Sequence, residues 1–240
     1  MSAVLLVGGM GTRLRAVVPS KPKPLASVGD KAFLELLVRQ LRRQGICRLI
    51  LCVGYLADQI ENQFGDGSEL DTVIEYSKEI QPLGTAGAVK QAQSYLRGSD
   101  QFLVMNGDSF MEINFSELLS FHSKKQALAT IAVRRIENAG RYGTVEVSAG
   151  NRVTAFVEKT GKEAPGLVNA GVYVFDRAIF DSIPNGPSSL EKDIFPNLLD
   201  RGVYAVEQQG MFIDIGTPED YARAQELYDR MHTAALLKES

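Results

Sequence analysis

Short, apolar, β-rich runs alternate with helical patterns through the first half of the chain, and this alternation restricts the fold more than any other feature. The apolar residues of the first helical pattern recur at helical spacing from Phe33 to Leu41, and Gly45 can end that helix. The run LILCV after Arg48 is continuously apolar, as in a central parallel strand covered on both faces. The pattern predicts a doubly wound α/β sheet with strands at 3–7, 48–55, 72–77 and 101–108, and helices at 32–45, 57–65, 85–96 and 114–126.

The pattern changes in the second half, where strand-like runs follow one another with fewer helices between them. A hairpin is predicted over 143–159, with its turn near Gly150 and Asn151, and such strands suggest antiparallel additions to the sheet. Thr217 is a good N-cap for the last helix, and the tail after Met231 has no clear ending signal and should fray. The other expected elements are strands at 130–136, 169–175, 203–209 and 211–216, and helices at 189–202 and 217–231.

Composition restricts the class of partner and the compartment. The chain has 240 residues, of which 45% are hydrophobic, and this suits one compact domain. A formal net charge of −3 gives no field that would attract nucleic acid or an anionic membrane, so we expect a small-molecule partner. The longest apolar runs are too short to span a bilayer, so we expect a cytoplasmic protein. Cys47 and Cys52 have no metal-type spacing and are interpreted as buried thiols.

The first strand leads into GGMGTRL, from Gly8 to Leu14. Three glycines let the backbone approach a ligand and direct its N–H groups toward phosphate oxygens, and Arg13 adds a guanidinium group. The segment has neither the spacing of a P-loop nor the full GxGxxG of a dinucleotide fold, so neither class is supported. Taken alone, a purely structural turn explains these glycines equally well.

A proline-stiffened basic loop, SKPKPLASVGDK, comes next and carries Lys21, Lys23 and Lys31. Its prolines restrict where the lysines point, and cations beside a backbone amide cradle suit a polyphosphate. The alternative is a solvated basic loop without a ligand.

With LVGGMGTRL followed by PKPL, the chain resembles the sugar 1-phosphate nucleotidyltransferase family from Val4 to about Tyr228. The resemblance implies one Rossmann-like, doubly wound mixed sheet of the GT-A-like type. It divides the single domain 1–240 into a nucleotide-binding half, 1–127, a sugar-phosphate-binding half, 128–231, and a tail, 232–240. It also makes Arg13 and Lys23 the catalytic pair. Lys31 has a lesser role because Ala32 stands where the family commonly has proline.

A second family block, EIQPLGTAGAV, begins at Glu79 and implies a turn against the nucleobase and ribose. Read without the family, GTAGA is a tight turn into a helix with small packing residues. The nucleotide-binding residues that the resemblance implies are Leu6, Gly8, Gly9, Gly11, Thr12, Arg13, Glu79, Pro82, Gly84 and Thr85.

The third block, NGD, places Asp108 at the end of a strand, where ligands gather in open α/β sheets. Its expected partner is Asp214 in FIDIGTPEDY, and two carboxylates with phosphate oxygens are a common arrangement for Mg²⁺. We therefore expect a magnesium site here, with Mn²⁺ as a substitute. Asp214 could instead satisfy backbone donors at the entry of the helix that follows.

The resemblance also assigns the sugar-phosphate site. The residues that it implies are Asn106, Gly143, Glu158, Lys159 and Asn169. Without the family, GTVEV and VTAFVEK are alternating strands with outward charges. His122 lies in the polar part of a helical pattern and is expected to face solvent.

The expected reaction joins a nucleoside triphosphate to a sugar 1-phosphate, most specifically GTP to D-glycero-D-manno-heptose 1-phosphate. Alternatives within the family are mannose 1-phosphate with GTP, or glucose 1-phosphate with UTP or dTTP. A silent regulatory homologue that binds NDP-sugar is a further alternative, although Arg13, Lys23, Asp108 and Asp214 are all present. The chain ends soon after DIGTPEDY, which suggests a single activity, and a homodimer is possible.

Overall fold

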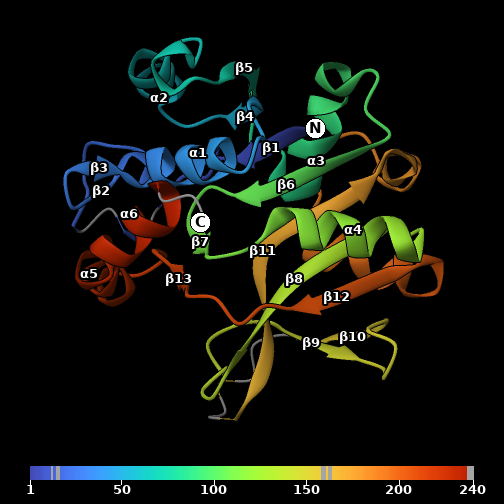
Figure 1. Ribbon diagram of the computed structural model, residues 1–240. Helices are drawn as coiled ribbons and strands as arrows, with labels where there is room; N and C mark the ends of the chain where they lie inside the picture. Colours follow the sequence, from blue (N-terminus) through green and yellow to red (C-terminus); the bar gives the residue numbers. More distant parts are fainter. Residues whose placement is uncertain (12, 15–16, 158–160, 162–163, 237–240) are drawn as a thin grey trace.

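The computed structural model describes residues 1–11, 13–14, 17–157, 161 and 164–236. Within them a nine-stranded sheet runs in the order β10-β9-β11-β6-β1-β4-β5, with β8 beside β11 and β12 beside β8 (Figure 1). The parallel strands are β1 (Ser2–Leu6), β4 (Arg48–Val53), β5 (Val73–Lys78) and β6 (Gln101–Asn106). Their helices are α1 (Phe33–Arg43), α2 (Ala57–Phe64), α3 (Gly84–Gln91) and α4 (Phe115–Lys125).

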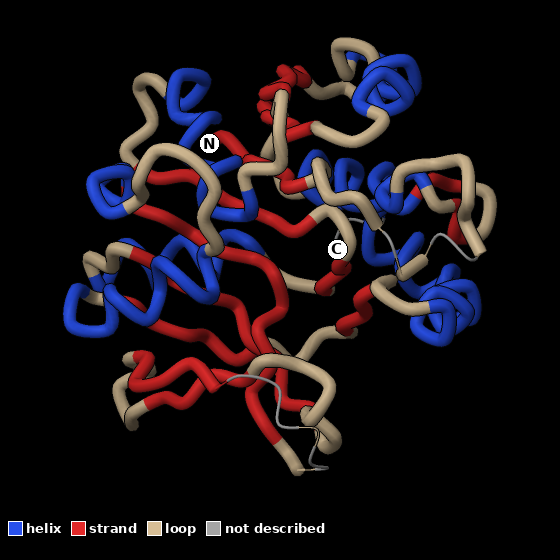
Figure 2. Tube along the Cα trace, turned by 180° about the vertical axis from the view of Figure 1, so that it is seen from behind, coloured by secondary structure: helices blue, strands red, loops and turns tan. Residues whose placement is uncertain are grey.

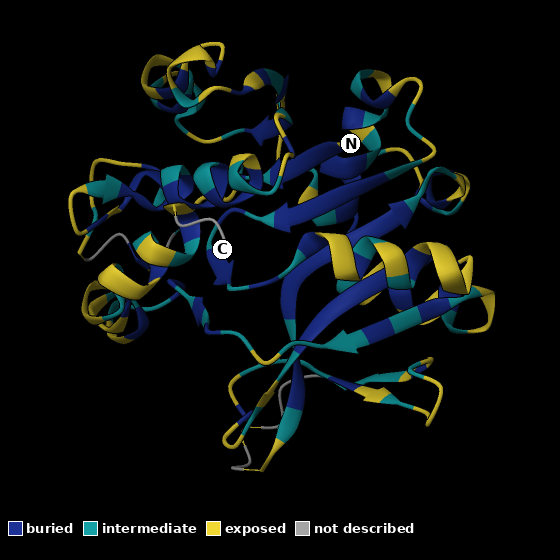
Figure 3. Cartoon of the chain, viewed as in Figure 1, coloured by how far each residue is buried: buried dark blue, intermediate teal, exposed yellow. Residues whose placement is uncertain are grey.

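The helices cover both faces of this sheet, as Figure 2 shows from behind. Alternate residues of β1 enter two separate hydrophobic clusters: Leu5 packs in the cluster that contains α1, and Val4 in the cluster that contains α3. The sheet between the two clusters is buried, whereas α4 exposes its outer face (Figure 3). This arrangement confirms the predicted doubly wound fold, and the C-terminal edge of β1 and β6 is left for a ligand.

The second half adds strands of mixed direction. They are β8 (Ala129–Ile136), β9 (Thr144–Val147), β10 (Val153–Val157), β11 (Gly166–Asp176) and β12 (Val203–Glu207). β11 runs antiparallel to β6 and β8, and β9 and β10 form the expected hairpin, whose turn includes Asn151 at φ 65°. The antiparallel additions predicted from the sequence are therefore present.

The described residues also form two small ribbons and two further α-helices. The ribbons pair β2 (Ser27–Val28) with β3 (Lys31–Ala32), and β7 (Ser109–Met111) with β13 (Phe212–Asp214). The helices α5 (Pro218–Glu226) and α6 (Tyr228–Leu236) follow, and the Thr217 side chain accepts a hydrogen bond from the Asp220 N–H as the predicted cap. Among the helices of the described residues, none is long and apolar enough to cross a membrane.

Several sequence expectations are wrong in detail. The helix predicted at 85–96 is α-helical only to Gln91 and continues as a 3₁₀ segment, Ala92–Leu96, and the helix predicted at 217–231 is interrupted at Leu227 between α5 and α6. The segment predicted as a helix at 189–202 is a π-helical turn, Leu190–Ile194, followed by a 3₁₀ segment, Phe195–Arg201. Fraying was expected after Met231, but α6 continues to Leu236 and buries Ala235 against the core; the last four residues, 237–240, lie outside the described residues. Cys52 is buried as expected, but Cys47 is exposed, since it precedes β4 and its neighbour Ile46 takes the buried position.

A further error concerns His122, which is buried at 3% exposure instead of facing solvent. It lies on the same side of α4 as Phe115 and Leu118, and that side faces the core. Its Nδ1 lies 2.9 Å from the Thr130 hydroxyl of β8. Burial lowers the pKa of the imidazole to about 4, so His122 is a neutral core residue.

Candidate active site

The glycine loop lies at the C-terminal end of β1, between the ends of β4 and β6. The Val7 N–H donates to the Cys52 carbonyl oxygen, and the Gly107 N–H donates to the Leu6 carbonyl oxygen. At Gly8 a Cβ would come within 2.6 Å of the Glu79 Oε1 atom, so a larger residue would displace that carboxylate. Close packing of three strand ends thus explains the glycine and leaves backbone groups at the C-terminal edge of the sheet.

Lys23 lies beside this loop and bridges two carboxylates. Its Nζ atom is 2.6 Å from Asp108 Oδ2 and 3.7 Å from Asp214 Oδ1, and its side chain is only 10% exposed. Pro22 holds extended backbone just before the 3₁₀ turn that carries Lys23, which fixes where the lysine side chain starts. The structure therefore brings together three residues that lie far apart in the sequence.

The ribbon of β7 and β13 explains how the two carboxylates meet. Asp108 precedes β7, Asp214 ends β13, and Asp214 pairs with Ser109 in the antiparallel register. The Ile215 N–H also donates to the Asp108 carbonyl oxygen at 2.9 Å. Asp214 accepts from the Gly216 N–H at 2.5 Å, so it fills the helix-entry role that the sequence left open. One oxygen of the carboxylate makes that bond, and the other remains for a ligand.

The electrostatics of the pair suit an additional cation. Burial and, second, the charge of Asp108 raise the pKa of the Asp214 carboxyl, while Lys23 opposes the shift. A carboxylate held under these conditions gains from a second positive charge, and both groups are hard oxygen donors of the kind that Mg²⁺ accepts. Among the described residues, no group of three or more His, Cys, Asp and Glu could hold a metal, so phosphate and water oxygens would complete the coordination.

A small cavity of about 180 Å³ lies beside Lys23, and we call it the phosphate cavity after the ligand predicted for it. Gly9, Gly11, Arg13 and Gly107 line it together with Lys23 and Asp108. Backbone N–H groups, one guanidinium and one ammonium around such a space can bind phosphate oxygens. Thr12, the remaining loop residue predicted to bind nucleotide, lies outside the described residues.

A second cavity, of about 310 Å³, adjoins the first and is lined by the residues predicted to contact the base and the ribose. We call it the nucleotide cavity after that prediction. The carboxylate of Glu79 accepts from the Leu83 N–H at 2.9 Å, and burial raises the pKa of its carboxyl. Gly84 has φ +70°, and a Cβ there would come within 2.5 Å of the Ser188 carbonyl oxygen. The predicted nucleotide residues that line this cavity are Leu6, Gly8, Gly9, Glu79, Pro82, Gly84 and Thr85.

The third cavity, of about 480 Å³, is lined by those residues predicted to bind the sugar phosphate that the structure describes. We call it the sugar cavity after that prediction. Asn106, Gly143 and Asn169 line it, together with Asp214. Asn106 lines the nucleotide cavity as well, so the two spaces meet beside the carboxylate pair. Glu158 and Lys159 lie outside the described residues.

Sequence reasoning missed Glu191, which connects the nucleotide and sugar cavities. Its Oε2 accepts from the hydroxyl groups of Thr85, at 3.0 Å, and Ser189, at 2.9 Å. Its Oε1 accepts from the Tyr173 hydroxyl at 3.0 Å. The signal was present, because the Glu of SLEKDIFP follows a serine that caps the turn, but no spacing rule connects it to Thr85.

Asn169 extends the same network. Its Nδ2 donates to the Tyr173 hydroxyl at 2.9 Å, and its Oδ1 accepts from the Gly171 N–H at 2.9 Å. Burial raises the pKa of the Tyr173 phenol, which keeps it a neutral donor to Glu191. Asn169 is thus held by a bulge in β11, with Gly171 at φ +70°.

The other two lysines of the basic loop lie apart from Lys23. Lys21 is exposed, and Lys31 forms ion pairs with Asp30 at 3.3 Å and Glu35 at 3.9 Å beside the β2–β3 ribbon. Neither lines one of the three cavities. The lesser role expected for Lys31 stays a prediction.

The curated relatives and one family model agree on the class of protein. The family model described as nucleotidyl transferase matches residues 2–230. Mannose-1-phosphate guanylyltransferase of Mycobacterium tuberculosis (strain ATCC 25618 / H37Rv) is 39% identical over 227 residues, which are 93% of this chain and 63% of the relative. The catalytic subunit beta of the Dictyostelium discoideum mannose-1-phosphate guanylyltransferase is 37% identical, over 95% of this chain and 64% of the length of the relative. The chain thus spans somewhat less than two thirds of these relatives.

Two solved structures share the fold of this chain over at least 95% of its residues. HddC from Yersinia pseudotuberculosis, complexed with GMP-PN, has a TM-score of 0.84 and 32% identity, over 95% of this chain and 99% of HddC. A putative glucose-1-phosphate thymidylyltransferase from Bacillus anthracis, in complex with a sucrose, has a TM-score of 0.85 at 20% identity and shares the fold. The fold, the glycine loop with its lysine and carboxylates, and these comparisons lead to one conclusion: the chain belongs to the nucleotidyl transferase family.

Proposed function

We propose that this protein transfers GMP from GTP to a sugar 1-phosphate, most specifically D-glycero-D-manno-heptose 1-phosphate, giving GDP-heptose and pyrophosphate. The observation that carries the proposal is the position of Lys23. Its ammonium lies between Asp108, which lines the phosphate and nucleotide cavities, and Asp214, which lines the sugar cavity. A reaction between two phosphate groups needs such a concentration of charge.

In the proposed reaction a phosphate oxygen of the sugar 1-phosphate attacks the α-phosphorus of GTP, and the bond to the pyrophosphate oxygen breaks. The nucleophile is already an anion, so the protein has to position the groups and neutralise charge, and needs no general base. Arg13 and Lys23 would hold the triphosphate oxygens and stabilise the charge that develops on the leaving pyrophosphate. Asp108 and Asp214 would hold Mg²⁺, or Mn²⁺ in its place, which when bound neutralises charge on the phosphate oxygens.

The three cavities provide places for the parts of the substrates. The nucleoside would lie against Leu6, Pro82 and Gly84, and the sugar against Gly143 and Asn169. Lys159 and Glu158 remain proposed contacts of the sugar phosphate from the family resemblance alone. The network through Glu191 would hold both cavities in a fixed relation to each other.

Guanine is favoured because the mannose-1-phosphate relatives named above are guanylyltransferases and HddC was solved with GMP-PN. The heptose is favoured by the blocks EIQPLGTAGA, NGDSF, RYGTVE and SLEKDIFP, which resemble the short heptose 1-phosphate guanylyltransferases. Mannose 1-phosphate is the second candidate, because the relatives that carry its name are 34–39% identical to this chain. A reaction that consumes GTP also suits the cytoplasm, which we include in the proposal.

Pyrophosphate release with Mg²⁺ tests the proposal directly. GTP, ATP, UTP, CTP and dTTP would each be combined with the 1-phosphates of D-glycero-D-manno-heptose, mannose and glucose. We expect fastest release with GTP and the heptose phosphate. Fastest release with mannose 1-phosphate would replace the sugar, and fastest release with UTP or dTTP would replace the base. No release with any pair would contradict the enzymatic proposal and favour an NDP-sugar-binding homologue.

A further inference from the structure

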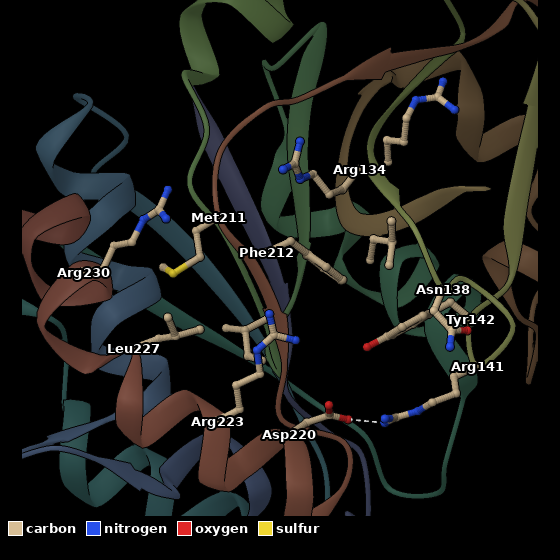
Figure 4. A pocket seen from close by; sticks show the side chains of 13 residues that line it. Arg134, Asn138, Arg141, Tyr142, Met211, Phe212, Asp220, Arg223, Leu227 and Arg230 are labelled. Carbon is tan, nitrogen blue, oxygen red and sulfur yellow. Dashed lines mark hydrogen bonds and ion pairs between the residues drawn. The ribbon is translucent and has the colours of Figure 1, made fainter. Parts of the chain in front are cut away.

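A separate cavity of about 500 Å³ lies between the end of β8, the start of β13 and the helices α5 and α6 (Figure 4). Five arginines line it and come from four parts of the chain, and we call this space the arginine cavity. They are Arg134 and Arg135 of β8, Arg141 of the loop before β9, Arg223 of α5 and Arg230 of α6. None of these residues was assigned a role in the proposed transfer.

Three of the five arginines already have carboxylate partners. Arg141 contacts Asp220 at 2.6 Å, the pair joined by the dashed line in Figure 4. Arg135 contacts Glu207 at 3.2 Å, and Arg230 contacts Glu112 at 2.8 Å. Their charges are largely neutralised, so they contribute shape more than net charge.

The other two arginines carry charge that no carboxylate of the described residues neutralises. Within the described residues, the Arg134 guanidinium donates only to neutral acceptors, the Gln208 carbonyl oxygen at 3.2 Å and the Gln209 side chain at 3.1 Å. Arg223 extends upward from α5 in Figure 4, between Phe212 and Leu227, and its guanidinium has no hydrogen-bond or ion-pair partner in the described part of the chain. A concave site focuses such unpaired charge and attracts anions. A guanidinium matches the oxygens of phosphate by two parallel hydrogen bonds.

The walls between the arginines are partly apolar. Met211 is 7% exposed, and Phe212 and Leu227 line the same space. A bare inorganic ion would leave these side chains in water, whereas a phosphate with an organic body would cover them. A cluster of arginines that served only as a solvated surface would lack these apolar walls.

One wall also belongs to the candidate active site. Tyr142 and Phe212 line both the arginine cavity and the sugar cavity, and their rings meet edge to face with centroids 6.2 Å apart. Burial is the main cause that raises the pKa of the Tyr142 phenol, and charges on both sides modify it: Arg223 lowers it and Asp214 raises it. The two spaces are therefore neighbours, separated by one layer of side chains.

We propose that the arginine cavity is a second binding site, which takes a phosphorylated small organic molecule through Arg134 and Arg223 and covers its organic part with Met211 and Leu227. The bound molecule would lie against the back of the Tyr142 and Phe212 wall. The site is distinct from the phosphate cavity at Lys23, since the two share no lining residue.

Methyl NMR of methionine separates the two sites within one sample. The chain has six methionines, of which Met211 lines the arginine cavity and Met10 lines the nucleotide cavity. Protein labelled with [methyl-¹³C]methionine would be titrated, without divalent metal, with inorganic phosphate and then with ribose 5-phosphate, which carries the same single phosphate. The Met211 signal is assigned with Met211→Leu. We expect it to shift and saturate, at lower concentrations of ribose 5-phosphate than of inorganic phosphate.

The double variant Arg134→Gln/Arg223→Gln should weaken the Met211 response to ribose 5-phosphate at least about tenfold, while Arg97→Gln, an exposed arginine outside both cavities, should leave it unchanged. If the double variant fails to fold, Arg223→Gln alone, which loses no ion pair to a described residue, should weaken the response severalfold. A Met211 signal that does not move, or that moves equally in the variant or with potassium chloride at matched ionic strength, would overturn the proposal. Equal affinity for inorganic phosphate and for ribose 5-phosphate would contradict the proposal that the cavity binds the organic part of the ligand.

Discussion

The Nζ atom of Lys23 lies 2.6 Å from Asp108 Oδ2, and this ion pair joins the basic loop after β1 to the end of β6. Lys23 also approaches Asp214 at 3.7 Å, so one ammonium serves two carboxylates. One positive charge cannot fully neutralise two negative ones. The negative charge that remains lowers the stability of the folded protein and suits the further cation that we propose here.

Asp214→Asn should stabilise the metal-free protein. Burial and Asp108 raise the pKa of this carboxyl in the folded state, so the charged form is disfavoured there, and stability is lost as pH rises through the folded pKa. Asparagine keeps the acceptor for the Gly216 N–H without the charge. We expect a gain of about 1 kcal/mol in urea unfolding at pH 7.5 without divalent metal.

The matched control is Asp181→Asn, an exposed carboxylate outside the three cavities, which should leave stability unchanged. In the same Asp214→Asn protein the rate of pyrophosphate release should fall at least about tenfold, since a proposed metal ligand is removed. A less stable Asp214→Asn protein would show that the carboxylate has a structural role that outweighs its charge.

Glu191→Gln tests the link between the nucleotide cavity and the sugar cavity. The carboxylate accepts three hydroxyl hydrogen bonds, and glutamine offers one oxygen in place of two. We expect the KM values for the nucleotide and for the sugar phosphate to rise together, each by about three- to tenfold, because each lost bond contributes about 1 kcal/mol. Glu226→Gln on the exposed face of α5 is the control. A rise in only one KM would show that the cavities are positioned independently.

Gly84→Ala and Gly98→Ala separate two costs of replacing a glycine. Both positions have positive φ, +70° and +83°, so alanine costs about 1 kcal/mol at each for backbone conformation alone. A Cβ at Gly98 meets nothing within 4 Å, whereas one at Gly84 comes within 2.5 Å of the Ser188 carbonyl oxygen. Urea unfolding should show a clearly larger loss for Gly84→Ala, with weaker nucleotide binding. Equal losses would mean that the Ser188 segment moves aside at no cost.

His122 should make stability depend on pH in the acidic range. Burial lowers its pKa to about 4 in the folded protein, from the ordinary value of 6.5 that it regains in the unfolded chain. The unfolded chain therefore binds the proton more readily between these two values. Stability should fall as pH decreases from about 6.5 to about 4, with this residue contributing up to about 3 kcal/mol. Chemical unfolding of the wild type and His122→Gln at several pH values measures it, and identical slopes in that window would show that another group is responsible.

The sequence predicted the order of elements in the first half well, because each strand and helix there has its own local signal. The helix from Phe33 ends with Gly45 at φ +80°, as its spacing and the glycine indicated. By contrast, the β7–β13 ribbon has strands of only three residues, and their pairing spans about half the chain, so no local pattern reveals it.

The candidate site was partly accessible from the sequence for the same reason. Lys23, Asp108 and Asp214 stand in motifs, and the structure places them together. Glu191 was not predicted as a site residue because its hydrogen-bond partners come from α3 and β11, and such a network exists only once the chain has folded. His122 was misjudged because its polar neighbours in sequence hid its alignment with Phe115 and Leu118.

Label transfer tests the central claim, that chemistry occurs at the α-phosphorus beside Lys23. Protein with Mg²⁺ and heptose 1-phosphate would receive GTP labelled at either the α or the γ phosphate, with Lys23→Ala and the control Lys31→Ala in parallel. We predict α label in the NDP-sugar and γ label in pyrophosphate. The rate should fall about 10²- to 10³-fold in Lys23→Ala and hardly in Lys31→Ala. Label from the γ phosphate in the sugar product, or full activity in Lys23→Ala, would contradict the account.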